Sequence, residues 1–203
     1  IVLAAALMAP LAAEAASFGA GPLIWSHRGS SYLARENTLE AFDLSADQGA
    51  DGFELDLFVT APDPVTGQRN LAVFHDPDLN RLTNVEAVFP LSRARDTDGD
   101  GTGDTYFIAD FTMAELRTLE VDADSRAGRV ALQADPRNPV AQPTAYRIPS
   151  YAEALDLAEA RGQKVLTEVK LTDADNAAER TAAQDLLIAE WTARGYTDAT
   201  SPV

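Results

Sequence analysis

The sequence predicts an α/β fold with a parallel sheet. Short apolar segments alternate with helical segments, the apolar segments have strand length, and helix-starting and helix-stopping residues flank the helical segments. The chain has 203 residues, 46% of them hydrophobic, which is enough for one domain with a substantial core. No internal repeat is visible in the sequence.

Composition excludes several classes of protein. The chain carries 32 acidic residues against 16 Lys and Arg, so its formal net charge is −16. A surface this acidic repels nucleic-acid phosphates and anionic lipid, so any phosphate substrate must be held by a few local cations. With no cysteine, the chain has no disulfide, no zinc–thiolate site and no thiol nucleophile.

The first 16 residues resemble part of a secretory signal peptide. Residues 1–11 are almost wholly apolar, and Ala13-Glu14-Ala15 has the small-x-small pattern of a cleavage site. The run is too short to span a bilayer, so no stable membrane insertion is expected. A buried N-terminal helix is the alternative, although Pro10 interrupts it. We expect export to the periplasm or the medium.

The first strand and the first helix come next. Residues 22–26 form a short apolar strand that ends at His27. Asn37 is predicted to begin a helix, because an oxygen side chain there and Glu40 three positions later have the spacing of a capping box. Gly49 ends this helix.

Two further strands follow. Residues 52–59 alternate so that one face is wholly apolar, while Glu54 and Asp56 lie next to each other on the other face. Residues 71–74 form the third strand, which ends at His75.

The second half begins with an irregular excursion at residues 77–148, which contains a short helical piece at 112–119. Excursions of this length are usually functional or disordered. A capped helix at 151–161, a fourth strand at 164–170 and an amphipathic helix at 176–194 complete the pattern.

Charged residues stand at or near the carboxyl end of each predicted strand. In a parallel α/β sheet or barrel these ends form one rim, where catalytic groups gather. The residues concerned are His27, Arg28, Glu54, Asp56, His75, Asp76, Glu168 and Lys170.

Glu54 and Asp56 suggest a metal site, because two neighbouring carboxylates repel each other unless a cation lies between them. Hard oxygen ligands suit Mg²⁺ or Ca²⁺ better than a transition metal. Simpler alternatives are a solvated edge face for this pair, ordinary core or surface histidines, and a plain ion pair for Lys170.

An ordered set of motifs between Leu23 and Lys170 resembles the glycerophosphodiester phosphodiesterases. Segments within 80–112 are similar to the exported bacterial branch, which has a long insertion after the third strand. The motifs are His27-Arg28-Gly29, Glu36-Asn37-Thr38, Ala50–Asp56, His75-Asp76, Ile148-Pro149-Ser150 and Glu168-Val169-Lys170.

The resemblance implies a TIM-type (β/α)₈ barrel, of which the sequence shows about the first four strand units. Residues 17–203 would then be the N-terminal half of the barrel, with an insertion at about 77–148. It also implies metal-dependent hydrolysis of a glycerophosphodiester to an alcohol and glycerol 3-phosphate. By position it implies Glu54, Asp56 and Glu168 as ligands of Ca²⁺ or Mg²⁺, His27 and His75 as acid and base, Arg28 and Lys170 as phosphate-binding cations, and Glu36 in support.

Two other functions stay open. One is a related phospholipase D-like barrel that acts on choline lipids. The other is a calcium-dependent extracellular binding module without turnover. The partner expected is a small-molecule glycerophosphodiester, with no nucleic acid, and the oligomeric state is left open.

The segment 96–104 is a candidate second calcium loop. Alternate oxygen side chains with a glycine at the turn are typical of calcium loops, but Phe107 stands where an EF-hand needs a glutamate. A solvated acidic loop is the alternative. The candidate ligands are Asp96, Asp98, Asp100 and Asp104.

Overall fold

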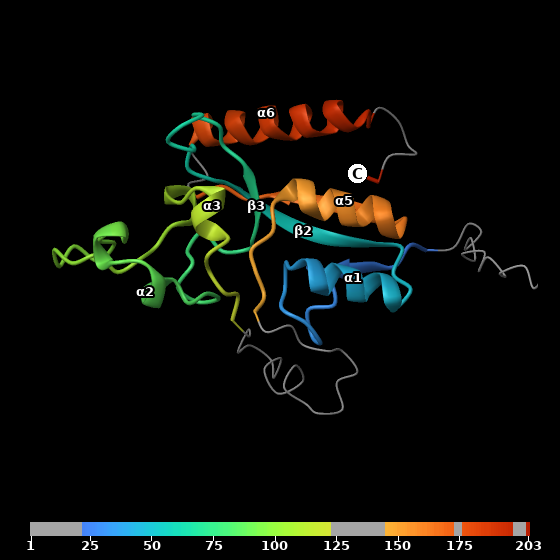
Figure 1. Ribbon diagram of the computed structural model, residues 1–203, viewed down its shortest axis with the longest axis horizontal. Coiled ribbons are helices and arrows are strands. Elements are labelled where there is room, and N and C mark those ends of the chain that lie inside the picture. The colour runs from blue at the N-terminus through green and yellow to red at the C-terminus, as the bar shows by residue number, and fades with distance from the viewer. Residues whose placement is uncertain (1–21, 123–144, 173–175, 197–201) are drawn as a thin grey trace, which may run out of the picture.

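A computed structural model of the chain describes residues 22–122, 145–172, 176–196 and 202–203 (Figure 1). The predicted signal peptide at 1–16 and the middle of the predicted excursion lie outside the described residues. Among the described residues, no helix is long and apolar enough to cross a membrane.

The sheet is built around β2 (Gly52–Val59), whose eight residues are all buried. β1 (Trp25–His27) pairs with β2 in parallel over residues 52–54, and β4 (Lys164–Val169) pairs in parallel with its other edge over residues 52–57. The parallel arrangement expected from the sequence is therefore confirmed for these three strands.

The third strand departs from that expectation. β3 (Leu71–Val73) runs antiparallel to β2, on the same edge as β1 but beyond its end, pairing with residues 57–59. The physical reason is that residues 60–70 form a hairpin turn, in which the Gly67 amide donates to the Asp63 carbonyl, and contain no helix, whereas a parallel partner is usually reached through a crossover helix. The described chain thus contains three parallel strands and one hairpin strand, not four parallel units.

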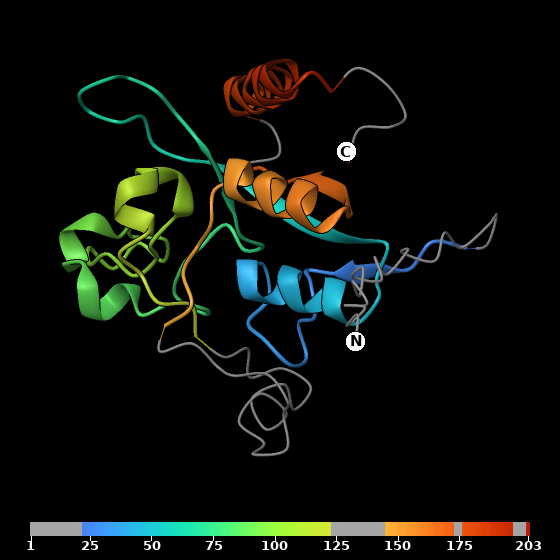
Figure 2. The same cartoon turned by 45° about the vertical axis from the view of Figure 1, so that its right-hand side comes forward.

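Three helices cover one face of the sheet: α1 (Leu39–Asp47), α5 (Tyr151–Arg161) and α6 (Ala177–Arg194). In Figures 1 and 2, α5 lies close against the strands and α6 lies beyond it on the same side. The apolar face of β2 packs into this layer, and Phe53 stacks on Phe42 of α1 with ring centroids 4.2 Å apart. The opposite face of the strand is therefore left for its acidic residues.

The predicted helix ends agree with the structure at α5 and α6 but not at α1. Ser150 forms a capping box at α5, and Gly162 ends that helix in the left-handed conformation at φ +66°. At α1 the N-cap is Thr38, whose hydroxyl accepts from the Ala41 amide. The predicted capping box on Asn37 is therefore wrong, and its side chain serves another purpose described below.

The described part of the excursion folds against the hairpin end of the sheet. It contains α2 (Val85–Val88), η1 (Leu91–Arg93), η2 (Ile108–Asp110) and α3 (Met113–Leu116), so the helix expected at 112–119 is shorter than predicted. Its apolar residues form a second core around Phe58 of β2 and Phe74, which directly follows β3. The segment is thus packed onto the sheet at the carboxyl end of β2.

Candidate active site

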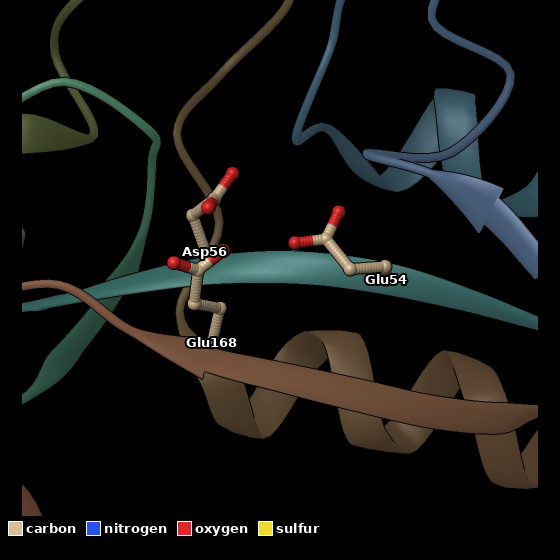
Figure 3. Close-up of side chains that lie close together, drawn as sticks. All are labelled: Glu54, Asp56 and Glu168. Atoms are coloured by element: carbon tan, nitrogen blue, oxygen red, sulfur yellow. The ribbon is translucent and has the colours of Figure 1, made fainter.

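Three carboxylates meet on the face of the sheet opposite the helices. Glu54 and Asp56 extend from β2, Glu168 extends from β4, and all three point away from α5 (Figure 3). One oxygen of each lies within 4.8 Å of those of the other two. The structure therefore brings together the three residues that the sequence suggested as metal ligands.

The two carboxylates on β2 are buried and only partly bonded. Glu54 is 7% exposed and Asp56 is fully buried, so the alternative of a solvated edge face is wrong. Glu54 Oε1 and Asp56 Oδ1 have no hydrogen-bond partner. A buried carboxylate oxygen without a partner costs free energy unless a cation compensates it.

The pKa of Glu54 also indicates that a cation is needed beside these carboxylates. Burial and the negative charge of nearby Asp56 raise the pKa of Glu54 to about 7. A divalent cation would remove this conflict, and hard carboxylate oxygens are the ligands that Ca²⁺ and Mg²⁺ prefer. The three residues therefore fit a divalent metal of this type.

His27 lies beside the carboxylates at the end of β1. Its Nε2 is 3.8 Å from Glu54 Oε2, and 65% of its side chain is exposed. An open depression of about 550 Å³ adjoins it, lined by residues that include Ser30, Tyr32 and Gln48. His27 can thus meet both the carboxylate cluster and a molecule from solvent.

His75 is held by a neighbouring carboxylate. Its Nδ1 lies 2.6 Å from Asp76 Oδ1, while Asp76 Oδ2 accepts from Arg81 Nε at 2.6 Å. Burial alone would raise the pKa of Asp76, but hydrogen bonds from Arg81 and His75 outweigh it and lower that pKa. A charged His75 also contributes to lowering the pKa of Glu168, so this histidine lies within electrostatic reach of the cluster.

The sequence reasoning assigned no role to Asp76 or Arg81. Their arrangement fixes one ring nitrogen of His75 and leaves Nε2 for proton exchange. The only signal in the sequence is that Asp76 directly follows His75, and nothing in the sequence identifies Arg81 as its second partner.

Two cations border the carboxylates. Arg28 donates from Nη1 to Glu36 Oε1 at 3.0 Å, and its Nε lies 3.2 Å from Asp56 Oδ2. Lys170 Nζ donates to Glu168 and lies 3.4 Å from Asp56 Oδ1. Lys170 therefore makes the ion pair considered as its simpler alternative, and it does so inside the cluster.

The pKa of Lys170 reflects two opposing effects. Burial disfavours the charged ammonium, but the hydrogen bond to Glu168 and the charge of Asp56 outweigh burial and raise the pKa above its ordinary value. Glu36, 4% exposed, bonds Arg28 and lies 3.9 Å from Arg81 Nη2. It thus stands between the two arginines, and its supporting role stays a prediction.

The acidic loop only partly matches its prediction. Carboxylate oxygens of Asp96, Asp98 and Asp104 come within 4.8 Å of one another on the surface. Asp100 is not among them, and its carboxylate accepts from the Thr102 amide. The structure therefore gathers three of the four candidate ligands in this loop.

Comparison with known proteins gives one consistent result. The Glycerophosphoryl diester phosphodiesterase family matches residues 27–201 of this chain. A glycerophosphodiester phosphodiesterase of Haemophilus influenzae is 30% identical over 149 residues, which are 70% of this chain and 37% of that protein.

Two solved structures resemble the chain, each with 26% sequence identity. One is an Oleispira antarctica phosphodiesterase in complex with the product sn-glycerol-3-phosphate, at a TM-score of 0.52. The other is a putative glycerophosphoryl diester phosphodiesterase from Silicibacter pomeroyi, at 0.59. Each similarity covers 84% of this chain and 53% of the solved one. The chain spans about a third of the length of three curated relatives, one of them the Haemophilus influenzae enzyme, and less of several others.

Proposed function

This chain belongs to the glycerophosphoryl diester phosphodiesterase family, and we propose that its site serves metal-dependent hydrolysis of a glycerophosphodiester to an alcohol and glycerol 3-phosphate. The fold agrees with the family, because three parallel strands with helices on one face form part of a (β/α)₈ barrel. The proposal depends chiefly on the buried carboxylates Glu54 and Asp56, each of which has one oxygen without a hydrogen bond, and on His27, which lies beside Glu54. A structural relative that holds sn-glycerol-3-phosphate supports the product class.

Glu54, Asp56 and Glu168 would hold Ca²⁺ or Mg²⁺. When bound, such an ion supplies positive charge where phosphoryl oxygens accumulate negative charge. Because β2 and β4 are neighbouring strands in fixed register, the three carboxylates keep their spacing without support from a loop.

We assign the phosphate to Arg28 and Lys170. A guanidinium can grip two phosphate oxygens, while an ammonium acts as a point charge. Both cations already lie against Asp56, so they sit at the border between the metal carboxylates and the substrate.

His27 and His75 would move the protons. One imidazole accepts a proton from the water that attacks the phosphorus, and the other donates a proton to the alcohol oxygen as its bond to phosphorus breaks. With Asp76 at Nδ1, His75 exchanges its proton through Nε2. His27 is open to solvent, as a group that meets substrate must be.

The test is a substrate screen on the full-length protein with EDTA, Ca²⁺ or Mg²⁺. We expect metal-dependent release of glycerol 3-phosphate from glycerophosphocholine and glycerophosphoethanolamine, and none from the variant Glu168→Gln. Choline-lipid turnover without glycerol 3-phosphate would favour the phospholipase D-like alternative. Calcium binding without any turnover would favour the binding module.

We also propose that the protein is exported. The apolar run at 1–11 and the Ala13-Glu14-Ala15 pattern support this. Fractionation of the native host followed by N-terminal sequencing tests it, with a mature start near residue 16 or 17 expected. Recovery of the intact N-terminus in the cytoplasm would refute it.

A further inference from the structure

The loop between β1 and α1 donates a hydrogen bond to each of the two buried carboxylates of β2. The Arg28 backbone amide donates to Glu54 Oε2 at 3.0 Å, and the Asn37 side-chain amide donates to Asp56 Oδ2 at 2.9 Å. The remaining oxygens, Glu54 Oε1 and Asp56 Oδ1, are the two without a hydrogen-bond partner. The loop thus bonds one oxygen of each carboxylate and leaves the other without a hydrogen bond, although Asp56 Oδ1 lies 3.4 Å from Lys170 Nζ.

Asn37 also completes the backbone of β2 where the sheet has a gap. β1 pairs only as far as Glu54, and β3 begins to pair only at Leu57. Between them the Asp56 amide donates to Asn37 Oδ1 at 3.3 Å, and the Asp56 carbonyl accepts from Phe74 at 2.9 Å. The side chain of Asn37 therefore stands in for a missing peptide group.

The position of Asn37 restricts which residue can do this. Its φ is +56°, a left-handed conformation that Gly, Asn and Asp adopt most readily, and it is 2% exposed. Among these three, only Asn has a side chain that can donate to the carboxylate and accept from the amide at once. Thr38 supplies the helix cap, so capping does not explain Asn37.

We propose that Asn37 is a positioning residue for the metal site. Its amide fixes the rotation of the Asp56 carboxylate, so that Oδ2 faces the loop and Oδ1 lies on the side of Lys170, whose Nζ is 3.4 Å away and also bonds Glu168. This inference rests on the proposed metal-dependent function, because the oxygen that Asn37 leaves free is the one that would bind the ion. Partners that orient a ligand in this way typically change metal affinity by about 10–100-fold.

The experiment measures metal binding directly in the full-length protein. Asn37→Gly keeps the left-handed backbone and deletes the amide, and we expect it to raise the Kd for Ca²⁺ or Mg²⁺ by about 10–100-fold in calorimetric titration. At saturating metal its KM for glycerophosphocholine should stay near the wild-type value. Asn84→Gly is the matched control, since it removes a similar side-chain bond to the Glu120 amide and should lower the melting temperature without changing the metal Kd.

A wild-type metal Kd in Asn37→Gly would overturn the inference. If that variant does not fold, Asn37→Ala gives the same reading, because it also deletes the amide and adds no charge, although alanine adopts the left-handed backbone less readily than glycine. An equal loss of metal affinity in Asn84→Gly would show that the effect is general destabilisation, which also overturns the inference. The wild type should bind metal, and Glu168→Gln should abolish that binding. If the wild type binds none, or if Glu168→Gln binds metal as the wild type does, the proposed metal site is rejected, and the role of Asn37 with it.

Discussion

Asp56 on β2 and Glu168 on β4 are register partners in adjacent parallel strands, and Lys170 Nζ contacts both. Because register partners project to the same face, the sheet itself places the two carboxylates side by side. Asp56 is buried while half of the Glu168 side chain is exposed, so the pair has one inner and one outer member. This difference decides which variant tests the site most cleanly.

We predict that Glu168→Gln abolishes metal-stimulated turnover and leaves folding nearly unchanged. The change removes one of three hard ligands at a half-exposed position, where little desolvation is at stake. Activity against metal concentration, with the urea unfolding midpoint in EDTA as the folding control, checks this. Near-normal turnover at saturating Ca²⁺ and Mg²⁺ would remove Glu168 from the metal site.

His27→Ala and His75→Ala should each lower kcat by about 10²–10⁴-fold, the usual loss for an acid or a base. The double variant should be little slower than the slower single variant, because both residues act in one step. Steady-state kinetics on all three proteins decides the matter. If the fold-loss in kcat of the double variant equals the product of the two single losses, or if either single variant is only mildly slower, the two histidines do not act as a pair.

Asp76→Asn should lower kcat by about 10²-fold or more, with little change in substrate KM, because the amide cannot hold His75 as the carboxylate does. Asp76 contacts His75 and Arg81, so its effect is through orientation. The measurement is a kcat and KM comparison, with Arg81→Lys as a milder change to the same chain of contacts. An unchanged kcat would show that Asp76 does not set the orientation of His75.

In EDTA, the free energy of unfolding should fall as the pH rises from about 4.5 to about 7. The folded chain raises the pKa of Glu54 from 4.5 to about 7, so across this window it binds a proton that the unfolded chain has lost. Urea unfolding at pH 5 and pH 7.5 measures the change. Glu54→Gln stays neutral throughout and should show a smaller fall, and an equal fall in both proteins would argue against this titration.

The double variant Asp98→Asn with Asp100→Asn should leave turnover nearly intact. Both residues lie in the exposed surface loop, and only Asp98 belongs to the second acidic cluster. At most the variant should reduce a calcium-induced rise in melting temperature, since a loop site stabilises only by binding the folded state. A loss of turnover as large as that of Glu168→Gln would place the loop in the catalytic centre.

The sequence alone predicted most of the local structure. Two-residue alternation identified β2 and put Glu54 and Asp56 on one face, because strand side chains alternate whatever the strand pairs with. Capping residues and glycines located α5 and α6 almost to the residue, because these signals act within a few positions of the chain. For Glu168 the sequence predicted only a place at the same rim as the β2 carboxylates, and the direct pairing of β4 with β2 was decided by the tertiary structure.

The tertiary structure decided those strand directions and side-chain bonds that involve residues distant in sequence. It set the antiparallel direction of β3, and it moved the α1 cap from Asn37 to Thr38. Asn37 matched a capping pattern, yet its amide bonds Asp56, 19 positions away, because the sheet leaves the Asp56 amide unpaired there. A local pattern shows which bonds a side chain can make, but the gap in the sheet determines which bond it does make, and that gap exists only after the strands have assembled.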